Sequence, residues 1–227
     1  MDAQLLQISI VIVGAENNPT VLNPDFLHYN KIVREEWHWR LAAPAISTPP
    51  FSQVTYDSGV TITVDPTKIQ IVDSSAAPSL ENTRILELAR SYVTTLCHVR
   101  YSATGINFIS GLHVPKPSDY LKTRFIRHGS WDTDRHPLND VGLRFVYPLS
   151  DGRIVFSLDS GEVQLPSTEE NTPTQTTKAV LINANFHRDC RESYPNTASE
   201  VLTHLECAAK DADMYRSLLQ NVLLLSV

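Results

Sequence analysis

The sequence is poor in glycine and has no glycine-rich motif of the kind that holds phosphate groups. Only 8 of its 227 residues are glycine, and neither GxGxxG nor GxxxxGK[S/T] occurs. The HExxH signature of zinc peptidases and the GxSxG signature of serine hydrolases do not occur either. No catalytic residue, cofactor or metal site is therefore predicted from motifs.

Cysteine and long apolar runs are also scarce. The three cysteines, Cys97, Cys190 and Cys207, contain no CxxC pair, which argues against a disulfide framework or a zinc knuckle. Three thiols in a chain of this length fit a reducing compartment. The apolar run from Ile8 to Val13 is too short to span a bilayer and follows no basic segment. We therefore expect a cytoplasmic protein that does not bind membranes.

There is no excess of basic residues in either half of the chain. The net charge is -6. Residues 1–113 carry 7 Lys and Arg against 10 Asp and Glu, and residues 114–227 carry 12 against 15, so each part is at -3. Sequence-independent binding of nucleic acid normally needs a basic excess. Nucleic acid is therefore not an expected partner, although an RNA-binding module with a local basic face stays an alternative.

The clearest structural signal in the sequence is a meander of three strands from Phe51 to Asp73. Val60, Ile62 and Val64 alternate with threonines, which is typical of an antiparallel strand with one buried face. Asp57-Ser58-Gly59 and Asp65-Pro66-Thr67 supply the two turns. Asn23 and Pro24 predict the start of a short helix, as its cap and its first residue.

The remaining elements are predicted from periodicity and from turn residues. Strands are expected at residues 7–13, 101–113, 141–149, 153–158, 162–165 and 178–187, and helices at 80–96, 119–127 and 196–224. A second Asp-Ser-Gly turn, at Asp159–Gly161, would separate two of these strands. Thr197–Glu200 has the spacing of a capping box.

The order of elements predicts an α+β fold built from two β-rich antiparallel halves. GINF at residues 105–108 and NANF at 183–186 each follow strands that carry a DSG turn, which is a weak internal repeat. The halves would be about 1–114 and 115–227, within a single compact domain. Helices are expected on one face, and a long C-terminal helix would close the chain, with a buried stripe formed by Val201, Leu205, Ala208, Ala212, Tyr215, Leu219 and Val222 or Leu223.

Two clusters have residue types that are suitable for chemistry. His128, Asp132, Asp134 and His136 are metal-compatible ligands within nine positions, although a solvated loop explains them better. His187 and Cys190 combine an imidazole with a thiol, but strand neighbours alternate between faces, so the two need not meet. A metal-dependent hydrolase or nuclease is the enzymatic alternative.

Aromatic residues gather between Asn23 and Trp39. Phe26, Tyr29, Trp37 and Trp39 form the predicted partner-binding surface, since aromatic residues dominate the energetic centres of interfaces. The alternative is that these rings belong to the core.

Several short stretches resemble a family of known sequences. They are residues 9–30, the meander, GINF and GLRFVYPL at Gly142–Leu149. There the chain resembles a sporadically distributed family of uncharacterised bacterial proteins, some of which lie near defence genes, including CRISPR-linked ones. The resemblance implies a context of antiviral defence and no site residues. We therefore expect a non-enzymatic protein-interaction or regulatory protein whose partner is another protein.

Overall fold

The protein was analysed as a computed structural model, which describes residues 3–127, 129–165, 175–191 and 197–224. The strands are β1 (Ala3–Ala15), β2 (Ile46–Thr48), β3 (Phe51–Thr55), β4 (Val60–Asp65), β5 (Lys68–Asp73), β6 (Arg100–His113), β7 (Leu143–Pro148), β8 (Gly152–Leu165) and β9 (Gln175–Asp189). The helices are α1 (Pro24–Tyr29), α2 (Ile85–Thr95), α3 (Pro117–Phe125), α4 (Thr197–Glu206) and α5 (Ala208–Leu218). Short helical turns are η1 (Pro19–Val21), η2 (Glu35–Trp37) and the π-helical η3 (Leu219–Leu224).

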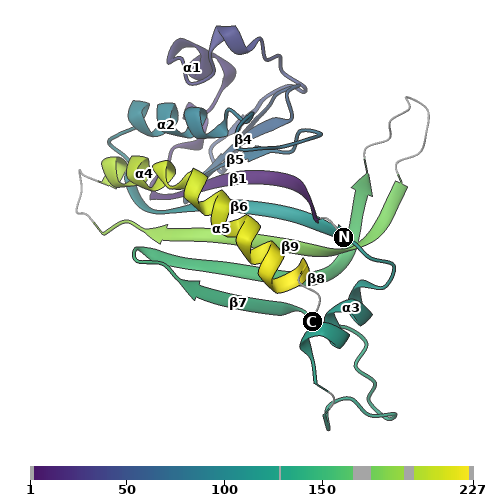
Figure 1. Cartoon of the computed structure of the whole chain (residues 1–227). Coiled ribbons are helices and arrows are strands. Elements are labelled where there is room, and N and C mark those ends of the chain that lie inside the picture. The colour runs from purple at the N-terminus through teal and green to yellow at the C-terminus, as the bar shows by residue number, and fades with distance from the viewer. Residues whose placement is uncertain (1–2, 128, 166–174, 192–196, 225–227) are drawn as a thin grey trace.

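All nine strands form a single antiparallel sheet, in the order β2-β3-β4-β5-β1-β6-β9-β8-β7 (Figure 1). The long strands β1 and β6 lie at its centre, where Ile10 is opposite Ile106. Strands β3 to β5 extend the sheet on the β1 side, and β9, β8 and β7 extend it on the β6 side. The predicted α+β class with antiparallel strands is confirmed, and so is the meander of Phe51–Asp73.

One face of the sheet carries the apolar core. Ile8, Ile10 and Ile12 alternate along β1 and are almost completely buried, as period-2 strand geometry requires. On β6, Phe108 stacks on Tyr215 of α5 with ring centroids 4.9 Å apart. Helices α4 and α5 contact β6 and run across the sheet (Figure 1). The core therefore lies between this sheet face and the helices.

The other face of the central strands is polar. Asn107 of β6 is directly opposite Ser9 of β1 and Asn185 of β9. Its side-chain amide donates to Ser9 Oγ at 3.2 Å. The GINF and NANF segments are consequently neighbours paired in this sheet, with Asn107 facing Asn185.

The second Asp-Ser-Gly stretch is not a turn, contrary to the prediction. Asp159–Gly161 lies inside the continuous strand β8, paired with β9. A Cβ atom at Gly161 would lie 2.5 Å from Leu181 Cδ1, so glycine provides room for a neighbouring side chain. Two predicted strands, 153–158 and 162–165, are thus one.

The long C-terminal helix is also divided. α4 ends at Glu206 and α5 begins at Ala208, and η3 follows. In the predicted capping box, Thr197 Oγ1 accepts a hydrogen bond from the Tyr101 amide, and the Glu200 carboxylate accepts one from the Arg191 amide. The predicted stripe is nevertheless buried from Val201 to Leu219 and includes Leu223.

The predicted short helix is confirmed as α1. Asn23 Oδ1 accepts from the Phe26 amide at 2.8 Å, and Pro24 occupies the first helical turn. Among the described helices, none combines the length and the apolar character that crossing a bilayer requires.

Candidate functional site

The segment from Asn23 to Trp39, called the aromatic segment below, is anchored to the core at its middle and reverses direction on both sides of that point. Ile32 and Val33, which follow α1, are buried and anchor the chain to the core. Lys31 and His38 adopt positive φ angles of 54° each, so the backbone reverses on both sides of this anchor. The exposed His38 ends η2, which leaves Trp37 and Trp39 on either side of a sharp bend.

The four predicted contact residues occupy different environments. Phe26 is half-buried and meets Tyr92 of α2 edge-on, with centroids 6.2 Å apart. Trp37 and Trp39 are half-buried and lie 4.9 Å apart. Tyr29 has 79% of its surface exposed. The structure thus brings the two tryptophans together, packs Phe26 against the core and leaves Tyr29 at the surface.

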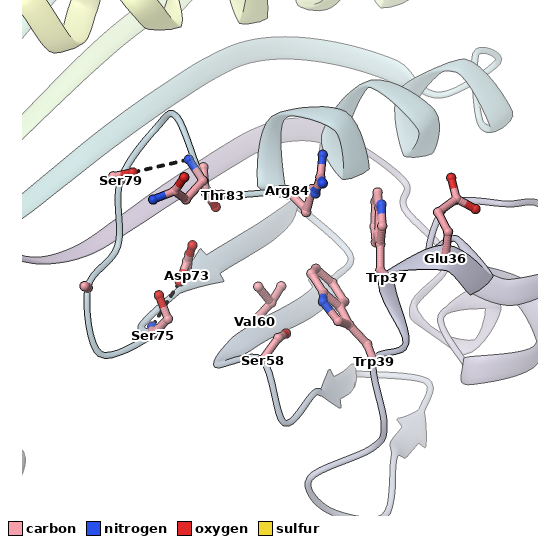
Figure 2. A pocket seen from close by; sticks show the side chains of 12 residues that line it. Glu36, Trp37, Trp39, Ser58, Val60, Asp73, Ser75, Ser79, Thr83 and Arg84 are labelled. Carbon is pink, nitrogen blue, oxygen red and sulfur yellow. Dashed lines mark hydrogen bonds between the residues drawn. The ribbon is translucent and has the colours of Figure 1, made fainter.

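The two tryptophans form one wall of a pocket of about 300 Å³ (Figure 2). The opposite side is formed by the start of β4, the end of β5 and the loop from Ser74 to Arg84. Hydroxyl groups of Ser58, Ser75 and Ser79 contribute to this lining. The pocket therefore has an aromatic side and a polar side.

Asp73 is the buried charged residue of this pocket. It is 4% exposed and lies at the end of β5, opposite the apolar residues Ile8 and Val60. One carboxylate oxygen accepts from the Ser75 amide at 2.9 Å. That is its only side-chain hydrogen bond among the described residues.

Ser58 and Arg84 also belong to the lining of this pocket. The Ser58 hydroxyl is buried and has no hydrogen-bond partner among the described residues. The guanidinium of Arg84 lies 6.0 Å from the Trp37 ring centroid and forms an ion pair with Glu87 at 3.7 Å. Glu87 pairs with Arg34 as well, so the two arginines share this carboxylate, and among the described residues no ion pair joins Arg84 to Asp73.

A second, larger hollow of about 1020 Å³ lies between α1 and α2. Tyr29 lines it together with Lys31, Arg34 and Arg90, and Glu36 belongs to both hollows. We call this larger hollow the α1–α2 groove. The aromatic segment thus contributes to two adjacent concave surfaces.

Sequence reasoning found the aromatic wall and missed the polar one. A signal for Asp73 was present, because Ile69, Ile71 and Asp73 alternate and so point to the same buried face. Arg84 and Ser58 gave no such signal, since both lie beside irregular segments whose position depends on the tertiary fold.

The loop of predicted metal-compatible residues does not form a metal site among the residues that are described. His128 lies outside them, and Asp132 Oδ1 accepts from the Leu138 amide at 2.9 Å. Asp134 and His136 are exposed. A group of three potential metal ligands is found nowhere in the described ranges.

His187 and Cys190 are not brought together either. By strand alternation His187 shares the polar sheet face with Asn185, and its Nε2 lies 2.9 Å from Asp189 Oδ1. Cys190 packs against the core. Burial, followed by the nearby Glu200 and Asp189, raises the pKa of the Cys190 thiol to about 12. A thiol with so high a pKa is protonated near neutral pH and is a poor nucleophile.

Comparison with known protein families finds no family model that matches this chain. Comparison with curated proteins finds no significant match.

Proposed function

We propose that this is a non-enzymatic protein-interaction or regulatory protein that binds another protein through its α1–α2 groove. One observation carries the proposal: Tyr29 is a large aromatic residue that is 79% exposed and lines a hollow of about 1020 Å³. Tyrosine is enriched among the residues that dominate binding energy at interfaces. An aromatic ring left in water beside a groove is an anchor that a partner can cover.

The charges around the groove suit a polypeptide. The lining holds the basic residues Lys31, Arg34 and Arg90 together with the acidic residues Glu35 and Glu36. His28 Nε2 lies 3.5 Å from Glu35, and Arg34 pairs with both Glu36 and Glu87. A mixed rim of this kind gives specificity through complementary charges and polar contacts. The volume of the groove, about 1020 Å³, lies at the upper end of the range for small-ligand pockets and leaves room for a short segment of chain.

The alternatives have less support. A metal-dependent hydrolase or nuclease needs converging ligands, and among the described residues Asp132 is engaged in a loop contact while Asp134 and His136 face solvent. An RNA-binding module needs a basic surface, whereas the chain has a net charge of -6.

We also infer that the chain contains two units of one plan, the first beginning at β1 and the second at β6, which puts the boundary before β6 and not near residue 114 as expected from the sequence. β1 leads through α1 and β2 to the meander β3–β5 and then to α2, and β6 leads through α3 to β7–β9 and then to α4. In the sheet, β5, β4 and β3 follow outward from β1, and β9, β8 and β7 follow outward from β6 in the same way. Helix α2 of the first unit contacts α4 of the second. Such a duplicated unit, with helices covering one sheet face, fits an interaction scaffold. We further propose that it is an accessory component of a bacterial antiviral defence system, an expectation that the sequence resemblance alone supports.

Capture of partners from cells of the source organism tests the proposal. Tyr29→Ala should reduce the recovered partner at least tenfold, since an aromatic anchor at an interface typically contributes about 2 kcal/mol or more. Trp131→Ala is the matched control, because Trp131 is also an exposed aromatic residue, 58% accessible, on the distant loop that follows α3. Equal loss with both variants, or no loss with Tyr29→Ala, would reject the groove as the contact surface.

A further inference from the structure

We propose that the Trp37–Trp39 pocket is a binding site for an organic cation, an ammonium or guanidinium group on an alkyl stem. This inference goes beyond the proposed partner surface, and it does not depend on the α1–α2 groove. It concerns the pocket of about 300 Å³ between the two tryptophans and the end of β5 (Figure 2). A volume of this size is at the lower end of the range for small-ligand sites.

The buried carboxylate supplies the first reason. Asp73 is 4% exposed, lies between Ile8 and Val60 on neighbouring strands, and accepts one hydrogen bond, from the Ser75 amide. A carboxylate taken out of water is costly unless it is paired with a cation or well hydrogen-bonded. The arginine in the lining, Arg84, pairs with Glu87, a carboxylate that it shares with Arg34, and no ion pair joins it to Asp73 among the described residues. Asp73 therefore still has the capacity to bind a positive charge that enters the pocket.

The aromatic wall supplies the second reason. Trp37 and Trp39 lie 4.9 Å apart with their planes inclined by 46°, and Trp39 in turn packs on Tyr56 at 5.3 Å. Indole faces attract cations and also cover alkyl stems. Arg84 near Trp37 shows that a cation is accommodated at this wall. A ligand with a charged tip and an apolar stem matches the combination of an indole wall and a carboxylate.

The unpartnered Ser58 hydroxyl supplies the third reason. It is buried, lines the same pocket and has no hydrogen-bond partner among the described residues. A hydroxyl can accept a hydrogen bond from an ammonium or guanidinium N–H. Because Ser58 and Asp73 line the same pocket, this hydroxyl is the second acceptor that we propose for the cation.

The cation can be a free small molecule or the side chain of a lysine or arginine in a protein. The test uses three probes on the full chain: n-butylammonium chloride, the uncharged n-butanol, and the peptide acetyl-Gly-Lys-Gly-amide. Binding is followed by tryptophan fluorescence in a Trp131→Phe background, so that the signal comes from Trp37 and Trp39. Butylammonium or the peptide should bind at least tenfold more tightly than butanol, and the tighter of the two identifies the source of the cation.

Variants separate binding from folding. Asp73→Asn should weaken cation binding at least tenfold, and Ser58→Ala should weaken it about threefold with an unchanged melting temperature, since that hydroxyl has no partner to lose. Asp134→Asn, which removes an exposed carboxylate elsewhere, should have no effect. If Asp73→Asn does not fold, the Ser58→Ala variant and the comparison with butanol still show whether the pocket binds a cation. Equal binding of butanol, unchanged affinity in Ser58→Ala, or binding of neither cation would overturn the proposal.

Discussion

At the scale of single residues, the buried charged side chains Arg188 and Asp211 in the second half of the chain form an ion pair with each other. The guanidinium of Arg188 donates to both carboxylate oxygens of Asp211 at 2.7 Å and to Asp151 at 3.0 Å. Arg188 and Asp211 are 4% and 2% exposed. Burial raises the pKa of Asp211, and the hydrogen bonds and charge of Arg188 counteract that rise. Asp73, by contrast, has no cationic partner among the described residues, which makes it the more informative residue for ligand binding.

His204 should make the stability of the protein depend on pH. Burial lowers its pKa below the ordinary 6.5, Arg188 lowers it further, and Glu200, Asp151 and Asp189 act in the opposite direction. Its Nδ1 atom is buried without a partner among the described residues. Between the lowered folded pKa and about 6.5, the unfolded chain binds a proton that the folded protein does not. The free energy of unfolding should therefore fall as the pH is lowered through 6.5.

Urea unfolding between pH 7.5 and pH 5.5 measures this effect. His204→Gln should lose less stability over this range than the unaltered chain does, because it removes the group with the depressed pKa. His136→Gln, which changes an exposed histidine, is the control and should follow the unaltered chain. Parallel curves for His204→Gln and the unaltered chain would show that His204 does not carry the pH dependence.

At the scale of elements, the C-terminal helices should be part of the core. Leu205 of α4 is completely buried, whereas Lys210 of α5 is exposed. Truncation of a core leucine typically costs about 2–5 kcal/mol. In a chain of this size that corresponds to a decrease of roughly 4–20 °C in melting temperature, at about 2–4 °C per kcal/mol. Melting curves should show this decrease for Leu205→Ala and almost no change for Lys210→Ala, and unchanged melting of Leu205→Ala would contradict a core role.

Elements with a clear local pattern were predictable, whereas those determined by neighbouring strands were not. The alternation of Val60, Ile62 and Val64 gave the meander, and Asn23-Pro24 gave the start of α1. The Asp159–Gly161 stretch has the composition of a turn, but its pairing with β9 keeps it extended. The break near Cys207 was equally hidden, because the apolar stripe continues from α4 into α5.

At the scale of the whole molecule, the candidate site depends on contacts that are distant in the sequence. The aromatic residues from Phe26 to Trp39 were visible in the sequence, but their distribution between core, pocket and surface was not. It arises because α2 supplies one wall of the groove, and the end of β5 supplies the polar wall of the pocket. The order of the nine strands likewise follows from pairing between β1 and β6, which are separated by the whole first meander and α2.

Amide hydrogen exchange of the protein, alone and bound to its captured partner, tests the central claim most directly. If the α1–α2 groove is the contact surface, binding should slow exchange within residues 28–36 and 90–95, the two segments that contain its lining residues. Exchange in β7, at the far edge of the sheet, should not change. Protection confined to β7 or to the polar face of the central strands, with residues 28–36 unaffected, would contradict the proposed surface.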